Sequence, residues 1–112
     1  MSYQIRYNDL IADDLLVIRK YWEEKLKSPP DRILNLILDK IEGLTEFPNI
    51  YQRLEDYPAL RRMVVEDYIV LYQVDEEREA VKIEYIYHGS RQLKKVLTRE
   101  VTDKIVLDKF RG

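Results

Sequence analysis

Residue types suited to acid–base or phosphate chemistry cluster in two short stretches of the chain. His88, the only histidine, ends a strand-like segment just before Gly89, and Arg91 follows three positions later. An imidazole at such a position can act as a general acid or base, although a hydrogen-bonded turn histidine is the commoner role. The second stretch is the pair Arg61-Arg62, which precedes a short apolar run.

Adjacent residues of a strand point to opposite faces, so only one of Arg61 and Arg62 can lie over a given sheet face. If the sheet curves, that arginine and Arg91, helped by Lys94 and Lys95, could form a clamp for a phosphate or carboxylate. By pattern alone an ordinary solvated surface is favoured. Tyrosines could stack on bases or bind a partner, or they could simply pack in the sheet, which is favoured for Tyr72; the four concerned are Tyr68, Tyr72, Tyr85 and Tyr87.

The composition restricts the classes of function. The chain has 112 residues, no Cys, one His and a net charge of −2 from 19 Lys+Arg and 21 Asp+Glu. Disulfides and Cys- or His-rich zinc sites are excluded, and we predict no metal and no cofactor. The charge balance is not that of a general nucleic-acid binder. No apolar run suits a membrane span and the N-terminus does not resemble a signal peptide, so we expect a cytoplasmic protein without membrane contact.

Hydrophobic periodicity predicts one domain, residues 1–112, with a strand, two helices, three strands and a helix in that order. The predicted helices cover residues 9–27, 33–44 and 93–110, and the strands cover residues 3–7, 61–66, 68–75 and 80–87. In the last strand Val81, Ile83, Tyr85 and Tyr87 are expected to share one face. The predicted fold class is α+β: an N-terminal strand and helical hairpin packed on a twisted antiparallel sheet, with a C-terminal helix.

Three segments, in this order and with this spacing, resemble the RelE/ParE superfamily of bacterial type II toxins. They are Leu-Thr-Glu-Phe-Pro at 44–48, the arginine-led strand, bend and aromatic-rich strand at 60–74, and Ile-Glu-Tyr-Ile-Tyr-His-Gly-Ser-Arg-Gln at 83–92. The resemblance covers roughly residues 3–97. Residues 98–112 form an extension beyond the usual end of the family.

The resemblance implies a toxin that a cognate antitoxin neutralises, with two known activities. The RelE-like branch cuts messenger RNA in the ribosomal A site without a metal, whereas the ParE-like branch inhibits DNA gyrase and is not a catalyst. His88 falls where YoeB-type nucleases carry a catalytic histidine, Arg61 or Arg62 falls near basic residues of the family, and Arg91 matches a basic position. Tyr68, however, stands where many RNA-cutting members have arginine, which brings the chain nearer to ParE.

Three functions therefore stay open, and whether the chain is an enzyme stays open with them. The first is gyrase inhibition, the second is ribosome-dependent cleavage of messenger RNA, and the third is a non-toxic member that only binds antitoxin and, through it, operator DNA. The antitoxin is expected to lie across the helical hairpin and a sheet edge. The C-terminal helix is expected either to fold back over the sheet near His88 or to pack against a second chain.

Overall fold

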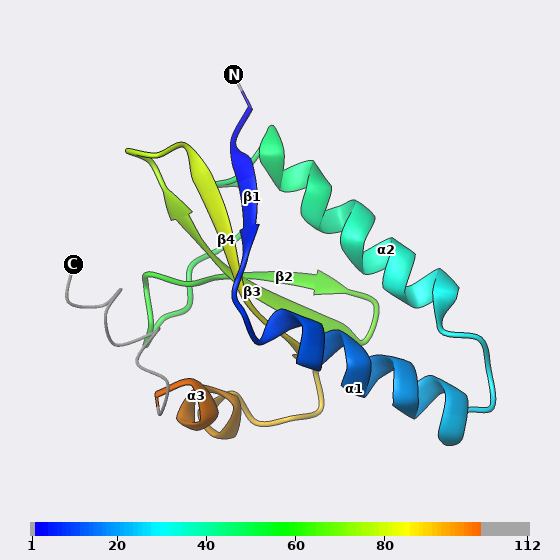
Figure 1. Cartoon of the computed structure of the whole chain (residues 1–112). Coiled ribbons are helices and arrows are strands. Elements are labelled where there is room, and N and C mark those ends of the chain that lie inside the picture. The colour runs from blue at the N-terminus through cyan, green and yellow to red at the C-terminus, as the bar shows by residue number, and fades with distance from the viewer. Residues whose placement is uncertain (1, 102–112) are drawn as a thin grey trace.

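The computed structural model describes residues 2–101, and the surroundings of side chains for residues 2–97. These residues contain four strands, three α-helices and one short 3-10 turn (Figure 1). In chain order these are β1 (Gln4–Tyr7), α1 (Ile11–Glu24), α2 (Asp31–Glu42), the 3-10 turn (Gly43–Thr45), β2 (Arg61–Val65), β3 (Tyr68–Asp75), β4 (Ala80–His88) and α3 (Leu93–Val101). The predicted order of elements is confirmed. The predicted third helix beyond residue 101 lies outside the described residues.

The sheet has the strand order β1-β4-β3-β2. The β2–β3 and β3–β4 pairs are antiparallel, as the short turns predict, and Glu66 adopts the positive φ of 53° that a two-residue hairpin favours. The first strand does join the sheet, but it pairs with β4 in parallel. The sheet was predicted to be antiparallel but is mixed, with one parallel pair at the β1 edge. The two helices between β1 and the later strands form a crossover connection, which parallel pairing requires.

Helices cover both faces of the sheet. The larger core lies between the sheet and the α1–α2 hairpin, whose helices run in opposite directions (Figure 1), and it includes Ile18, Ile37 and Tyr72. On the opposite face Val96 and Leu97 of α3 are buried with Leu71 and other residues of β3 and β4. The described part of the C-terminal helix therefore folds back on the sheet, which is the first of the two predicted arrangements.

A β-bulge in β4 corrects the predicted strand faces. The pairing with β3 runs Leu71 with Tyr85 but Tyr72 with Ile83, so Glu84 is an additional residue. An inserted residue reverses the alternation of side chains beyond it. Val81 and Ile83 therefore face the α1–α2 hairpin, whereas Tyr85 and Tyr87 face α3. The expectation that all four share a face is wrong for this reason.

Buried polar side chains hold the start of α1 beside the sheet. Asn8 accepts the backbone N–H of Leu10 through Oδ1 at 2.9 Å, and its Nδ2 donates to Oε1 of the buried Glu84 at 3.0 Å. Asp14, further along α1, accepts the backbone N–H of Ile86 at 3.0 Å. β1 ends at Tyr7, opposite Ile83. Beyond this point a side chain of α1, rather than a neighbouring strand, accepts the backbone hydrogen bond of β4. Within the described residues, no helix has the length and hydrophobicity to cross a bilayer.

Candidate functional site at the end of β4

Four of the five candidate residues gather where β4 ends. Tyr87, His88 and Arg91 line a hollow against α1, and Arg62 lines a shallower groove that His88 also borders. Arg61, the fifth, points to the other side of β2. The single histidine therefore lies between two surface depressions, with an exposed arginine in each.

The turn after β4 fixes the ring of His88. The backbone N–H of Ser90 donates to its Nδ1 at 3.0 Å, and the Ser90 hydroxyl lies 2.7 Å from the same nitrogen. Because Nδ1 accepts a backbone N–H, the proton of the neutral ring is on Nε2. Gly89 permits this tight turn: its N–H donates to the Asp67 carbonyl at 2.7 Å, and a Cβ there would approach that oxygen to 3.2 Å. The half-buried imidazole is thus oriented by the backbone.

An aromatic chain of contacts connects His88 to α1. The rings of His88 and Tyr68 meet edge to face, with centroids 5.4 Å apart and planes at 84°. The Tyr68 hydroxyl accepts the indole N–H of Trp22 at 2.9 Å. Burial raises the pKa of Tyr68, against the opposing effect of the Trp22 hydrogen bond.

A surface ion pair lies beside these aromatic residues. Arg32 lies 6.0 Å from the centroid of the Trp22 ring and binds Glu66 through two hydrogen bonds of 2.9 and 3.1 Å. The hydrogen bond from Arg32 lowers the pKa of the Glu66 carboxyl. This pair joins α2 to the β2–β3 turn, where Glu66 also lines the groove that His88 borders.

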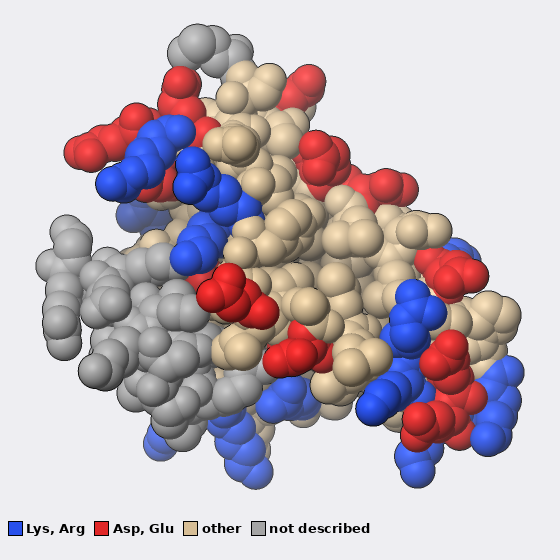
Figure 2. All heavy atoms as spheres, in the orientation of Figure 1, with Lys and Arg blue, Asp and Glu red and all other residues tan. Residues whose placement is uncertain are grey.

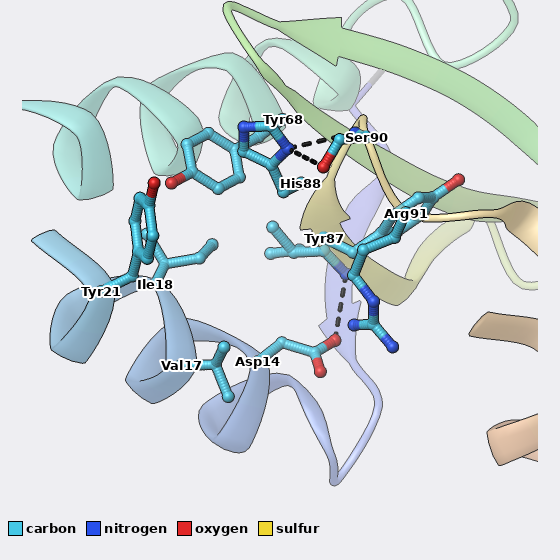
Figure 3. Close-up of a pocket in the computed structure, with 10 residues that line it drawn as sticks. Asp14, Val17, Ile18, Tyr21, Tyr68, Tyr87, His88, Ser90 and Arg91 are labelled. Atoms are coloured by element: carbon cyan, nitrogen blue, oxygen red, sulfur yellow. Dashed lines mark hydrogen bonds between the residues drawn. The ribbon is translucent and has the colours of Figure 1, made fainter. Parts of the chain in front are cut away.

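The hollow between α1 and β4, which we call the α1–β4 pocket, has a volume of about 270 Å³ (Figure 3). Its β-sheet side is formed by the end of β4 and the first residue of β3. Its helical side is formed by residues of α1 that sequence reasoning did not assign to a site. The ten lining residues are Asp14, Val17, Ile18, Tyr21, Tyr68, Ile86, Tyr87, His88, Ser90 and Arg91.

The exposed apolar residues of α1 are the signal that could have identified this pocket. Val17 is 65% exposed and Tyr21 is 47% exposed, and both lie off the stripe that packs on the sheet. An amphipathic surface helix normally places polar residues there. The sequence therefore contained the signal, but the partner strand could be identified only from the fold.

Tyr87 and Tyr72 are both held by the core. Tyr87 is only 5% exposed and packs in the same cluster as Val96 and Leu97 of α3. Burial raises its pKa, while the positive charges of Arg62 and Arg91 act in the opposite direction. Tyr72 donates its hydroxyl to the Pro48 carbonyl at 2.8 Å, and burial raises its pKa to about 12. The packing role predicted for Tyr72 is confirmed.

The arginine pair on β2 is divided between two roles. Arg61 donates from Nη1 to the carbonyls of Tyr51 at 2.7 Å and Asn49 at 3.3 Å, so it anchors the loop that precedes β2. Arg62 is exposed and lies on the opposite side, with its backbone N–H bound to the Gln52 carbonyl at 3.0 Å. The two arginines point to opposite faces, as predicted, and only Arg62 lies near His88.

Acidic groups accompany the basic ones throughout this region. Glu66 and Asp67 line the groove shared by Arg62 and His88, and Asp14 lines the α1–β4 pocket. Figure 2 shows acidic and basic side chains interspersed around a broad uncharged area, rather than one basic patch. Among the residues that the structure describes, no three His, Asp or Glu side chains are placed to hold one metal ion.

Comparison with solved structures identifies the class of fold. The RelBE2 toxin–antitoxin complex of Mycobacterium tuberculosis includes a chain with a TM-score of 0.61 and 23% identity, over 79% of this chain and 99% of that chain. A free E. coli RelE mutant has a TM-score of 0.61 and 18% identity, over 94% of this chain and 99% of that chain. A chain of the chromosomal ParDE system of P. aeruginosa has a TM-score of 0.64 and 17% identity, over 78% of this chain and 96% of that chain. The fold is that of the RelE/ParE toxins.

A sequence comparison assigns the family within this class. Residues 5–93 match the family described as the ParE toxin of type II toxin–antitoxin systems, parDE. The chain therefore belongs to the ParE toxin family, and the predicted membership of the RelE/ParE superfamily is confirmed. No curated protein matches the chain.

Proposed function

We propose that this toxin inhibits DNA gyrase by binding it, without catalysing a reaction, and that a cognate antitoxin keeps it inactive. The observation that supports this most strongly is the match to the ParE family over residues 5–93, which include every candidate residue at the end of β4. The antitoxin is supported by the likeness to a toxin–antitoxin complex. Since gyrase is cytoplasmic, the proposed location is the cytoplasm.

The electrostatics of the site favour a protein target over RNA. Asp67 borders the groove beside His88, and a carboxylate at such a position repels the phosphates of a polyanion, whereas Glu66 in the same groove is paired with Arg32. Tyr87, which could otherwise stack on a base, is covered by α3. Mixed charges around apolar depressions suit a protein surface, where both signs can find partners.

Ribosome-dependent cleavage of messenger RNA is the second candidate, and the placement of His88 favours it. Arg91 lines the α1–β4 pocket together with this histidine, and Arg62 lines the separate groove that the histidine also borders, so a phosphate in either depression would meet one cation near the imidazole. In that case His88 would transfer the proton, and Arg62 or Arg91 would stabilise the transition-state charge. His88→Ala should then reduce cleavage by about two to four powers of ten. The third candidate is a non-toxic protein that binds only the antitoxin and, through it, operator DNA.

Two assays on the purified full chain and one expression test in growing cells separate these functions. Inhibition of supercoiling of relaxed plasmid by gyrase supports the first proposal, and its absence contradicts it. Cleavage of A-site messenger on programmed ribosomes would establish the second. Expression without growth arrest, and without either activity, would establish the third.

The proposed antitoxin surface crosses the helical hairpin and a sheet edge. Leu16 on the outer side of α1 is 46% exposed, and Leu26 beyond its end is 45% exposed. β1, which precedes this helix in the chain, is a sheet edge with exposed residues. An amphipathic helix and an added strand of the antitoxin could cover these two features together. A complex in which the antitoxin contacts neither α1 nor a sheet edge would contradict this arrangement.

A further inference from the structure

We propose that the α1–β4 pocket is the docking site for one large apolar side chain of the target protein, accompanied by a carboxylate of the same protein. This inference rests on the proposed function, because it assigns the part of the toxin that contacts the inhibited protein. It differs from the nuclease hypothesis in its use of the site: the pocket binds a side chain, and no bond is made or broken.

The size and lining of the pocket fit a single anchor residue. Its volume of about 270 Å³ is below the ~300 Å³ at which small-molecule and cofactor sites begin. Ile18 and Ile86 are nearly fully buried and contribute apolar walls, whereas Val17 and Tyr21 stand exposed on the helical side. Such a combination of apolar wall and exposed apolar rim is typical of a pocket for a binding hot spot.

Hydrogen-bond donors select the polar part of the occupant. The Nδ1 atom of His88 is already bound by Ser90, so the ring has its Nε2–H to offer. Arg91 is exposed and forms no ion pair among the described residues. Asp14 also lines the pocket, where its Oδ2 accepts the Ile86 N–H, and its negative charge restricts an incoming carboxylate to the side of Arg91 that faces away from it. A carboxylate next to the apolar anchor would pair with Arg91.

A matched pair of variants on α1 tests the proposal. Val17→Asp places a charge at the pocket, and Ala12→Asp introduces the same charge at an exposed position of α1 that does not line it. We expect Val17→Asp to raise the concentration that half-inhibits gyrase by about thirtyfold. Ala12→Asp should raise it by less than about threefold. Equal urea midpoints would show that both variants remain folded.

The opposite outcomes are equally specific. Full inhibition by Val17→Asp would overturn the proposal. If Val17→Asp inhibits gyrase fully but no longer binds the antitoxin, the antitoxin occupies the pocket and the proposal is wrong. Equal loss of inhibition in both variants would also overturn it, because a general effect of charge on α1 would then be sufficient.

A fragment titration tests the pocket even if gyrase is not the target. The probe is 3-phenylpropionate, an apolar ring with a carboxylate, and its neutral control is 3-phenylpropanamide. In amide-detected NMR we expect the acid to shift His88 and Ile86 with a dissociation constant on the order of millimolar, and the amide to bind more weakly. Arg91→Gln should remove that difference. No shift at these residues, or equal binding of acid and amide, would overturn the proposed chemistry.

A wild-type protein that binds the fragment as expected but leaves gyrase active would contradict the proposed function. The pocket would then keep its ligand chemistry, but its assignment to the inhibited protein would be wrong. Failure of the function and failure of the pocket chemistry are thus separate results.

Discussion

The indole N–H of Trp22 donates to the hydroxyl of Tyr68 over 2.9 Å, which joins the middle of the helical hairpin to the first residue of β3. The ring of the same tyrosine packs edge to face on His88. Three residues from α1, β3 and β4 therefore form one continuous contact at the α1–β4 pocket. The shape of the candidate site depends on this contact as well as on the residues that line it.

A double-mutant cycle on this hydrogen bond should show energetic coupling. Trp22→Phe and Tyr68→Phe each remove one partner and keep an aromatic ring, so the interaction term should be about 1 kcal/mol in the free energy of unfolding. Urea denaturation of the two single variants, the double variant and the wild type gives this term. Strictly additive effects would mean that the bond contributes nothing to folding.

Asp14 should stabilise the part of β4 that extends beyond its pairing with β1. Asp14→Leu leaves the buried N–H of Ile86 without its acceptor, which should cost about 1–3 kcal/mol. Asp14→Asn keeps an acceptor oxygen and is the matched control, with a smaller loss. Amide exchange at Ile86 should accelerate in the leucine variant. Unchanged exchange there would contradict the role given to this carboxylate.

Tyr72 should make stability fall at high pH. Its pKa in the folded protein is about 12, above the ordinary value of 10.0, so its contribution is complete below pH 10 and is lost between pH 10 and 12. The full effect is about 2–3 kcal/mol. Tyr72→Phe removes the hydrogen bond to the Pro48 carbonyl, which should lower the free energy of unfolding by about 1 kcal/mol at pH 8. Because phenylalanine does not ionise, the variant should not lose further stability between pH 10 and 12. The wild type should be the more stable protein at pH 8 and the less stable near pH 12. A difference independent of pH would contradict the shift.

The C-terminal helix should contribute strongly to folding. Leu97 is 2% exposed and packs with residues of the sheet, so Leu97→Ala should cost about 2–5 kcal/mol. Lys95→Ala, on the exposed side of α3, should change stability by less than about 0.5 kcal/mol. Urea midpoints distinguish the two. Equal midpoints would show that α3 does not hold to the sheet in solution.

Hydrophobic periodicity was sufficient to predict most of the fold. The alternation of Tyr68, Val70 and Tyr72 agrees with their shared face in the structure, and periodic apolar residues of the helical hairpin such as Ile18 and Ile37 are buried. The faces of β4 were predicted wrongly because the bulge at Glu84 depends on its pairing with β3, which leaves no trace in the period of the strand. The parallel pairing of β1 is likewise a property of topology.

The site was predictable where neighbours in sequence are neighbours in space. His88 and Arg91 share one turn, so their proximity follows from the sequence. The role of Arg61 did not follow from the sequence, because its partners are backbone carbonyls of a loop without a recognisable hydrophobic period. Val17 and Tyr21 reach the site only through the packing of α1 on β4, nearly seventy residues away in sequence.

The supercoiling of relaxed plasmid by purified gyrase, titrated with the full chain, tests the central claim most directly. A protein that docks on gyrase should abolish supercoiling, and the cognate antitoxin should restore it. His88→Ala should weaken this inhibition by less than about tenfold, because no proton transfer is involved. Undiminished supercoiling at saturating toxin, together with messenger cleavage on programmed ribosomes that His88→Ala abolishes, would contradict the account.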